Sequence, residues 1–491
     1  MLLVVVCAVP LVIYLYVALH RIGYPYELEW LEGGAAEIVR RVADGRAMYV
    51  KPSLHYVPYP YTPLYFWVSG GLAHVTGVGF LPLRLVSLFS SLGCCALLWR
   101  IAWRETGDVV AGAVAVGLFT ATFAVSGAWL DIGRVDSLAL FVLLGAISVA
   151  RQVTKWPSGV LVGGLVFLAF MAKQDTLIAL GPVLLYLVLT RWRVGLAACV
   201  TAGTLLVGST YLLDRATHGW YGYYVFQELT HQGVTSSVWT TFFTKDLFHV
   251  PWAIGLGLIG LVFGVVGTSN RTAWGFWSMA WGGLLVSAFI SRLHSGGGED
   301  VLIPAYAAAA LLGAFGYDAL LRYAAAMPLT DSPRWKPWGA VLVGIALTLG
   351  IGVQLTALHY SPTRYIPTSA DQRAGQRFVA LVRHTSGTVV VSNHPYYDTL
   401  AGKESWAQGE SVHDVLRAGP STARTDLTAS INAFLRLHTP ATIFSDDAHY
   451  ALGSYSDPFF RLVSTHVIEC QSCFYPVTDI KRRPSFRFVR G

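Results

Sequence analysis

The aromatic run YPYTPLYFW at residues 59–67 closes a long polar loop that follows the apolar opening segment of the chain. The same loop carries an acidic cluster of Glu27, Glu29, Glu32 and Glu37. Tyrosine and tryptophan favour the boundary between bilayer and water, because their rings are apolar and their polar atoms still find partners. The loop therefore predicts a reaction site at a bilayer surface, with a plain interfacial belt of aromatic rings as the alternative.

The composition around this loop indicates a polytopic α-helical membrane protein. Of the 491 residues, 54% are hydrophobic and only 13% are charged, and the mean hydropathy is +0.51. Stretches long enough to cross a hydrocarbon core of about 30 Å recur up to Leu358 and then stop. The first is expected to be retained, since no basic leader or small-residue cleavage pattern accompanies it. We expect about eleven spans, at residues 1–20, 80–99, 109–129, 137–150, 157–172, 176–190, 194–213, 251–267, 273–290, 301–321 and 338–358.

The charged residues between these spans predict the topology. If residues 61–78 lie along the membrane surface, the basic loops all fall on the cytoplasmic side, as the positive-inside rule requires. Counting residues 61–78 as a span would reverse every later loop. The net charge of +7 is thus explained by topology, and no basic tract with interleaved aromatic residues suggests a nucleic-acid partner. The cytoplasmic loops then contain Arg100 and Arg104, Arg151 and Lys155, Arg191 and Arg193, Arg271, and Arg322, Arg334 and Lys336.

The outer side then receives the loop 21–80, the loops 131–136, 214–250 and 292–300, and the tail 359–491. The tail alternates helical patterns with β-branched runs at residues 388–392 and 441–445, which predicts a small extracytoplasmic α/β domain after a membrane core of residues 1–358. A helical pattern at residues 425–437 between the two runs favours parallel strands. Cys470 and Cys473 supply only half of a structural zinc site, so we expect a local disulfide or two unreactive thiols.

The glutamates of the first loop are the candidate bases. On a helix Glu29 and Glu32 would share one face, while Glu27 would point elsewhere. A partly desolvated carboxylate has a raised pKa and can accept a proton from an attacking hydroxyl. The alternative is an amphipathic surface helix with a solvated acidic face.

A second polar break, at residues 129–137, places Asp131, Arg134 and Asp136 between two apolar spans. Such charges are costly at a membrane boundary unless they are paired or used. Arg134 as a partner for either aspartate, or Asp136 as a helix cap, is the structural alternative. Hard oxygen ligands from Glu29, Glu32 and Asp131 would suit a divalent cation, and the histidines show no metal-ligand spacing.

Cationic and polar residues at the outer helix ends are candidate phosphate ligands. Arg84, Lys173 and His294 are placed to hold a phosphate at headgroup depth, with Gln174 next to Lys173. Ordinary snorkelling of Arg84 and Lys173 is the alternative. Tyr61 and Tyr65 in the aromatic run offer a platform for a sugar ring or a prenyl chain.

The pattern resembles the GT-C superfamily of membrane glycosyltransferases, in the branch of protein O-mannosyltransferases and the lipid A aminoarabinose transferase. Leu31-Glu32 followed by residues 36–40, AEIVR, is similar to the Asp-Glu pair and its sequel in the family's first outer loop. Residues 63–67 resemble its Pro-Leu-Tyr-Tyr-Trp segment, and Arg84-Leu85 its next helix. Residues 294–297 and 302–304 resemble a polar loop entering a late helix. Leu31 stands where the family has aspartate, and Tyr61-Thr62 where the lipid A enzyme has a lysine.

The resemblance implies an inverting transfer from a polyprenyl-phosphate-linked sugar to an acceptor hydroxyl outside the plasma (inner) membrane. Glu29 or Glu32 would be the base, and Asp131 would orient the acceptor or a metal. The cations already named, with Arg134, would stabilise the leaving phosphate. Family members accept glycan, lipid or protein acceptors. A transporter or flippase for a lipid-linked glycan, and a non-catalytic scaffold, are the rival interpretations.

Overall fold

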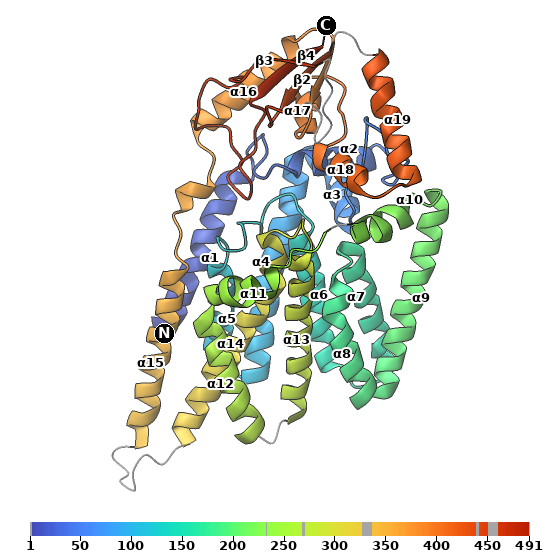
Figure 1. The fold of residues 1–491 in the computed structure, drawn as a ribbon. Helices are drawn as coiled ribbons and strands as arrows, with labels where there is room; N and C mark the ends of the chain where they lie inside the picture. The colour runs from blue at the N-terminus through green and yellow to red at the C-terminus, as the bar shows by residue number, and fades with distance from the viewer. Residues whose placement is uncertain are drawn as a thin grey trace.

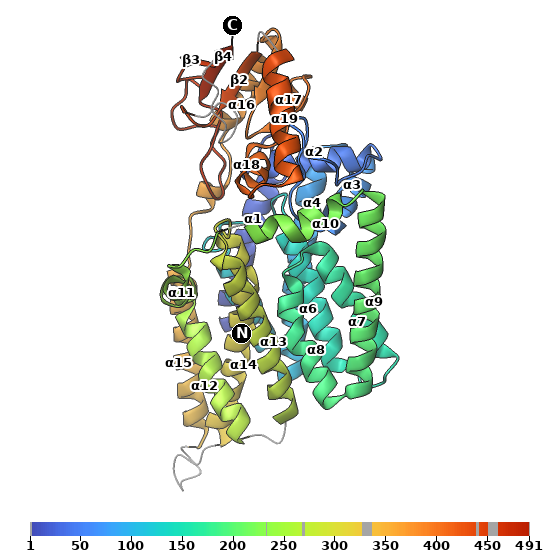
Figure 2. The same cartoon turned by 45° about the vertical axis from the view of Figure 1, so that its right-hand side comes forward.

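The computed structural model describes residues 2–231, 233–267, 271–326, 336–437, 441–449 and 460–490. Helices of the N-terminal part form an elongated bundle, and the chain ends in a small domain stacked on one end of it (Figures 1 and 2). The long helices of the bundle are α1 (Leu2–Arg21), α4 (Phe80–Thr106), α5 (Val109–Ala121), α6 (Asp136–Gln152), α7 (Ser158–Ala172), α8 (Thr176–Thr190), α9 (Trp192–Ala216), α12 (Pro251–Gly267), α13 (Arg271–Leu293), α14 (Ile303–Ala326) and α15 (Lys336–Ala357).

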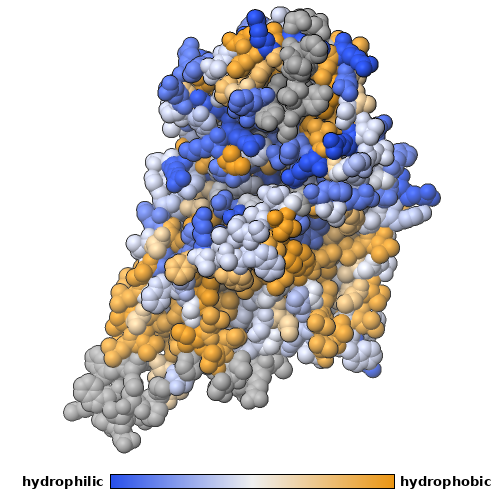
Figure 3. Space-filling view, viewed as in Figure 1, coloured by the Kyte–Doolittle hydropathy of each residue, from blue (hydrophilic) through white to orange (hydrophobic). Residues whose placement is uncertain are grey.

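Ten of the eleven ranges expected to be spans fall on one of these helices to within about two residues, but the range 109–129 is helical only as far as Ala121, because the chain turns after α5 and adopts positive φ at Gly127 and Ala128. Five described helical stretches are long and apolar enough to cross a bilayer, in α1, α4, α9, α13 and residues 299–326, and two bent pairs bring the number to seven. The helices α5, α7 and α8 are apolar but shorter. The surface of the bundle is largely hydrophobic, whereas the end that carries the small domain is hydrophilic (Figure 3). The protein is therefore a multi-pass membrane protein.

Close helix contacts in the bundle depend on small residues, as is usual where lipid removes the hydrophobic drive for association. At the crossing of α12 and α14, a side chain added at Gly316 would lie 2.0 Å from the carbonyl oxygen of Leu256. At the end of α4, Gly107 adopts φ 72°, the left-handed conformation that ends a helix, and Asp108 then caps α5 by accepting the amide of Val110. These local signals explain why two apolar helices follow each other so closely.

The first loop does not cross the bundle. It forms α2 (Glu32–Ala43) and α3 (Leu64–Thr76), which pack against each other at the end that carries the small domain (Figures 1 and 2). At 13 residues α3 is about 20 Å long, the same length as α5, so its position beside α2 rather than its length separates it from the helices of the bundle. This agrees with the expectation that residues 61–78 are not a span.

The basic loop residues gather at the opposite end of the bundle. Arg104, Arg151 and Arg191 line one shallow pocket there, and Arg151 pairs with Glu105 at 2.9 Å. Arg191 donates to the carbonyl of Val153 at 2.7 Å. Arg334 and the side chains of Arg271 and Lys336 lie outside the described residues. The described arginines of these loops thus gather at the end of the bundle away from the small domain, where Arg322 also donates to the carbonyl of Thr106.

The C-terminal residues fold around a four-stranded mixed sheet with the order β1-β2-β4-β3. Its first two strands, β1 (Thr388–Val391) and β2 (Ala441–Ser445), pair in parallel, with Thr388 opposite Ala441. The predicted strands and their parallel pairing are confirmed, and α19 (Thr422–Leu437) lies between them as the helical pattern indicated. The other elements are β3 (Arg461–Ser464), β4 (Phe486–Arg490), α16 (Ser369–His384), α17 (Pro395–Leu400) and α18 (Gly409–Arg417). Cys470 and Cys473 form a disulfide.

Candidate functional site

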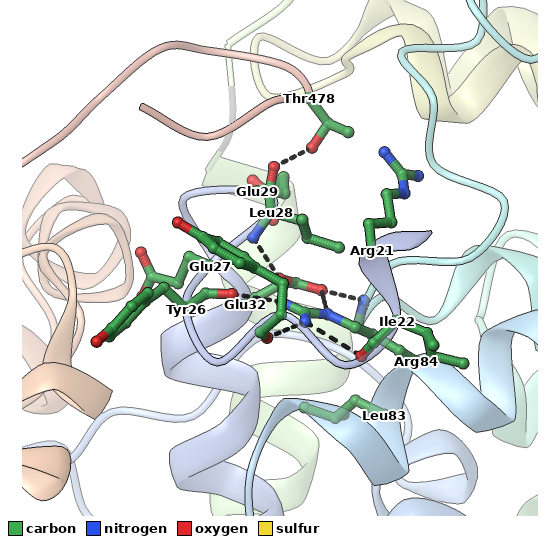
Figure 4. Close-up of polar contacts among 12 residues, drawn as sticks. Arg21, Ile22, Tyr26, Glu27, Leu28, Glu29, Glu32, Leu83, Arg84 and Thr478 are labelled. Carbon is green, nitrogen blue, oxygen red and sulfur yellow. Dashed lines mark hydrogen bonds and ion pairs between the residues drawn. The ribbon is translucent and has the colours of Figure 1, made fainter. Parts of the chain in front are cut away.

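Glu32, the first residue of α2, is a fully engaged carboxylate. Arg84 of α4 donates to both of its oxygens, at 3.1 and 2.7 Å, and the amides of Leu28 and Gly133 donate at 2.7 and 2.6 Å. Both side chains of the ion pair are completely buried, and Arg84 also donates to the carbonyl of Tyr26 (Figure 4). Burial alone would raise the pKa of Glu32, but Arg84 and the amides outweigh it and lower the pKa. Glu32 and Arg84 therefore tie the first loop to α4.

Asp131 is engaged in the same way by an arginine from the first helix. Arg21 donates Nε to Oδ2 at 2.7 Å and Nη2 to Oδ1 at 2.6 Å, and also reaches the carbonyl of Ala128 at 2.8 Å. Both side chains of the pair are buried. Glu32 and Asp131 each have an arginine partner, so these two carboxylates and Glu29 do not come together as the expected ligand set of a divalent metal ion. Among the described residues, no three histidine, cysteine or acidic side chains are grouped to hold a metal ion.

Glu29 differs from both of these acids. It lies in the turn before α2, apart from the Glu32–Arg84 pair and on the side of Thr478 (Figure 4). Its side chain is fully buried, and neither oxygen has a hydrogen-bond partner among the described residues. The nearest cation is Nη1 of Arg134, at 3.8 Å. Burial raises the pKa of Glu29 well above its usual value, and Arg134 offsets only part of the effect.

Arg134 connects Glu29 to a cavity of about 650 Å³ between the bundle and the small domain. Its Nη2 donates to the hydroxyl of Tyr61 at 3.0 Å, and its guanidinium stacks 4.7 Å from the ring of Trp129. Nε and Nη1 have no hydrogen-bond partner within the described part of the chain. A buried guanidinium with unused donors at a cavity wall is suited to bind an anion.

Lys173, at the end of α7, is the second cation of the cavity. Its Nζ lies 2.8 Å from Asp136 and 3.3 Å from Asp175. Asp136, the first residue of α6, thus enters the site through Lys173 rather than as a helix cap. The two predicted partners of Arg134 are both taken by other cations, Asp131 by Arg21 and Asp136 by Lys173.

The remaining predicted residues divide between the cavity and the protein core. Gln174 lines the cavity and donates to the carbonyl of Pro60 at 2.7 Å. His294 also lines it, and its Nδ1 is buried without a described partner. Tyr65 is instead buried against α4, where its hydroxyl donates to the carbonyl of Leu83 at 2.9 Å. Arg84 and Tyr65 are therefore not cavity residues, and the structure brings together Tyr61, Arg134, Lys173, Gln174 and His294.

Part of the cavity comes from residues that sequence reasoning missed. Leu31, Trp30, Tyr59 and Asp300 line it from the bundle side, within stretches already singled out for other residues. Across the cavity, α18 and the loop before β4 complete the wall. These residues lie hundreds of positions from the first loop, and no spacing in the sequence indicates that they meet it. They are Glu410, Ser411, Asp414, Arg417, Asp479, Ile480 and Arg482.

The small domain also holds the loop that carries Glu29. The ring of His394 lies between Glu27 and Asp446, with Nδ1 on the Glu27 carboxylate and Nε2 3.0 Å from Asp446. Burial alone would lower the pKa of His394, but Asp446 and Glu27 outweigh it and raise the pKa to about 10. Thr478 donates its amide and hydroxyl to the carbonyl of Leu28, at 3.1 and 2.6 Å. Residues 27 and 28, on one side of Glu29, are thus fixed from the small domain.

Comparison with known proteins identifies the fold. Residues 58–220 match the sequence model of the dolichyl-phosphate-mannose-protein mannosyltransferase family. Crystal structures of ArnT from Cupriavidus metallidurans, bound to undecaprenyl phosphate and in the apo state, are similar over 99% of this chain and 97% of theirs. Their TM-scores are 0.57 and 0.58, at 16% and 15% identity. The chain has the GT-C fold. The predicted resemblance to the GT-C superfamily and to this branch of it is confirmed.

A third solved structure is similar over less of the chain, and the family match does not cover the first half of the first loop. The Archaeoglobus fulgidus oligosaccharyltransferase, in complex with zinc and sulfate, is similar over 81% of this chain and 61% of its own, with a TM-score of 0.50 at 11% identity. No curated protein matches the chain by sequence. The family match begins after Glu29 and Glu32, so it includes Tyr61, Arg134 and Lys173 of this GT-C chain but neither glutamate.

Proposed function

We propose that the protein is an inverting glycosyltransferase that moves a sugar from a polyprenyl-phosphate donor to an acceptor hydroxyl on the extracytoplasmic face. The observation that carries the proposal is Glu29, a buried carboxylate with a raised pKa and no hydrogen-bond partner among the described residues. It lies behind Arg134 at the wall of a cavity that also presents Lys173. A general base and anion-binding cations side by side are what such a transfer needs.

In the proposed reaction, the acceptor hydroxyl attacks the anomeric carbon as the bond from that carbon to the phosphate oxygen breaks. Glu29 takes the hydroxyl proton, and the polyprenyl phosphate leaves with the bonding electron pair. Arg134 and Lys173 stabilise the phosphate, whose negative charge grows in the transition state, and His294 is placed to donate to it. Since Arg134 separates Glu29 from the cavity, its movement toward the phosphate would uncover the base.

The donor class is supported by the fold and by the position of the cavity. One of the similar ArnT structures has undecaprenyl phosphate bound. The cavity lies at one end of the bundle, against the small domain, whereas a transporter for lipid-linked glycans would be expected to place its polar site near the bilayer midplane. A transferase whose lipid donor lies in the outer leaflet fits this location.

The extracytoplasmic position of residues 359–491 is part of the proposal. The basic loops at the opposite end of the bundle favour the cytoplasm there, and the Cys470–Cys473 disulfide favours an oxidising compartment around the small domain. Arg436→Cys, on the exposed side of α19, should react with an impermeant maleimide in intact cells. Lys155→Cys, at the other end, should react only after permeabilisation. The reverse result would place the site in the cytoplasm.

The donor is tested by mass spectrometry of lipids that co-purify with the protein from its native membrane. We expect a polyprenyl phosphate with an added sugar mass in the wild type and in Glu29→Gln, which keeps the cations but lacks the base. Lys173→Met should lose most of it, because the phosphate loses a buried cation. Arg104→Gln, which removes a cation at the opposite end, is the matched control. Bulk phospholipids alone in all samples would contradict the proposal.

A further inference from the structure

The wall of the cavity formed by α18 has a different chemistry from the wall formed by the bundle. Gln408 caps α18 by accepting the amides of Glu410 and Ser411, at 2.6 and 3.2 Å. This start directs Glu410, Ser411 and Asp414, at positions i, i+1 and i+4 of the helix, toward the cavity. Arg417 follows on the same wall and pairs with Asp414 at 2.6 Å. We call these four residues the α18 wall.

The α18 wall contains a buried polar group that the protein itself does not satisfy. Ser411 is only 2% exposed, lines the cavity, and its hydroxyl has no hydrogen-bond partner among the described residues. Buried hydroxyls are nearly always hydrogen-bonded, so an unsatisfied one that lines a cavity indicates a ligand that supplies the missing partner.

The bundle side of the cavity also presents aromatic rings. Trp30, Tyr59, Tyr61 and Trp129 all line it. The guanidinium of Arg482 lies 4.4 Å from the centre of the Trp30 ring and holds it in place. Flat aromatic faces beside carboxylates and hydroxyls suit a ring that is apolar on its faces and carries hydroxyl groups on its edge. That description fits a pyranose.

The two sides of the cavity differ in the cations that they offer. On the bundle side, Arg134 and Lys173 suit the phosphate of the donor and lie with Asp175 and Asp300, whereas the α18 wall presents the carboxylates of Glu410 and Asp414 and one cation, Arg417, which is paired with Asp414. An anionic acceptor would find no uncompensated cation on the α18 wall, and a neutral polyol would find acceptors for its hydroxyl protons there. We propose that the α18 wall binds the hydroxyl groups of a neutral saccharide, so that the acceptor is a glycan. This rests on the proposed transferase function and adds the substrate class of its second subsite.

The test is saturation-transfer difference NMR on the purified full chain, in a detergent without a sugar headgroup. The probes are methyl glucoside, methyl galactoside and methyl mannoside, with glucose 6-phosphate as the anionic comparison and N-acetyl-serinamide as the peptide comparison. We expect at least one neutral glycoside to bind, and we expect glucose 6-phosphate and N-acetyl-serinamide to displace it poorly. Preferential binding of the phosphate or of the serine compound, or no glycoside binding, would overturn the proposal.

The variants locate the binding at α18. Ser411→Ala and Asp414→Asn each remove one acceptor and should weaken glycoside binding by about tenfold, since a hydrogen bond to a charged or otherwise unsatisfied buried group has that effect. Glu404→Gln is the matched control, because it makes the same acid-to-amide change at an exposed residue outside the cavity that is also paired, with His55. Equal binding by all three variants would also overturn the proposal. Thermal unfolding of each variant separates lost binding from lost folding, and Ser411→Ala removes no ion-pair partner.

The result remains separable from the proposed transfer reaction. Glycoside binding and sugar transfer are both measured in Glu29→Gln. Transfer lost with binding retained supports both the base and the saccharide subsite. Full transfer in that variant contradicts the proposed base while leaving the α18 wall to be judged by binding alone.

Discussion

Glu29 and Glu32 stand three residues apart and should respond in opposite ways to the same substitution. In Glu32→Gln, Arg84 keeps its buried guanidinium but loses the carboxylate paired with it, and two backbone amides face a group that no longer carries charge. Removing one partner of a buried ion pair typically costs about 3–5 kcal/mol. That is a large fraction of the roughly 5–15 kcal/mol by which domains are stable, so we expect low expression and a melting temperature several degrees lower.

Glu29→Gln removes a carboxylate that has no hydrogen bond to lose among the described residues. Its effect on the free energy of unfolding should stay within about 1 kcal/mol, because the buried charge carries its own desolvation cost. Transfer should nevertheless fall by a factor of about 10² to 10⁴, the usual contribution of a general base. In the wild type, the rate of transfer should fall as the pH drops through the raised pKa of Glu29, since only the deprotonated carboxylate accepts a proton.

The assay combines two measurements on each variant. Intrinsic tryptophan fluorescence during heating gives the melting temperature, and transfer is followed with a lipid-linked sugar donor added to detergent-solubilised protein. A Glu29→Gln variant that is stable and transfers sugar at the wild-type rate would refute the assignment of the base. A Glu32→Gln variant that melts like the wild type would refute the structural role of the Glu32–Arg84 pair.

Three further perturbations test other parts of the site. Asp131→Asn leaves Arg21 buried without its partner and should lower the free energy of unfolding by about 3–5 kcal/mol, so that the melting temperature falls as strongly as in Glu32→Gln. An unchanged melting curve would contradict the pairing. Arg134→Gln should reduce kcat by about 10²-fold or more, measured on the fraction of protein that stays folded, because a cation that acts on the transition state is lost, and a pure KM effect would contradict that role. His394 has a raised pKa of about 10, so its stabilising effect is complete below about pH 6.5 and is lost as the pH rises through about 10. The wild type should lose thermal stability between pH 8 and 10 more steeply than His394→Gln, and parallel pH profiles would show that the histidine is not charged.

The helices of the bundle could be predicted because their signal is local. A run of apolar residues bounded by charge is enough to define α4 or α9, and the lengths of α3 and α12 follow from where those runs stop. The parallel pairing of β1 and β2 was accessible for the same reason, since a helical pattern between two β-branched runs indicates a crossover.

The roles of the charged residues could not be predicted in the same way. The expectation that Glu29 and Glu32 share a helix face is wrong, because α2 begins at Glu32 and Glu29 lies in the preceding turn. Arg84 neither snorkels nor faces the cavity, since Glu32 and the backbone carbonyls around it hold it in the core. In each case the deciding partner lies on a different element, and a single sequence carries no signal for such pairs.

The hold of the small domain on the first loop has a consequence for biosynthesis. Leu28 receives its hydrogen bonds from Thr478, a residue made 450 positions later. At about 5–20 residues per second, the loop emerges roughly 20 to 90 s before its partner exists. During that interval the Glu32–Arg84 pair can already tie the first loop to α4, but residues 27 and 28 lack their contacts with the small domain. An unfinished or truncated polypeptide would therefore hold Glu29 from one side alone, so that completion of the chain is also the moment at which the proposed transfer can begin.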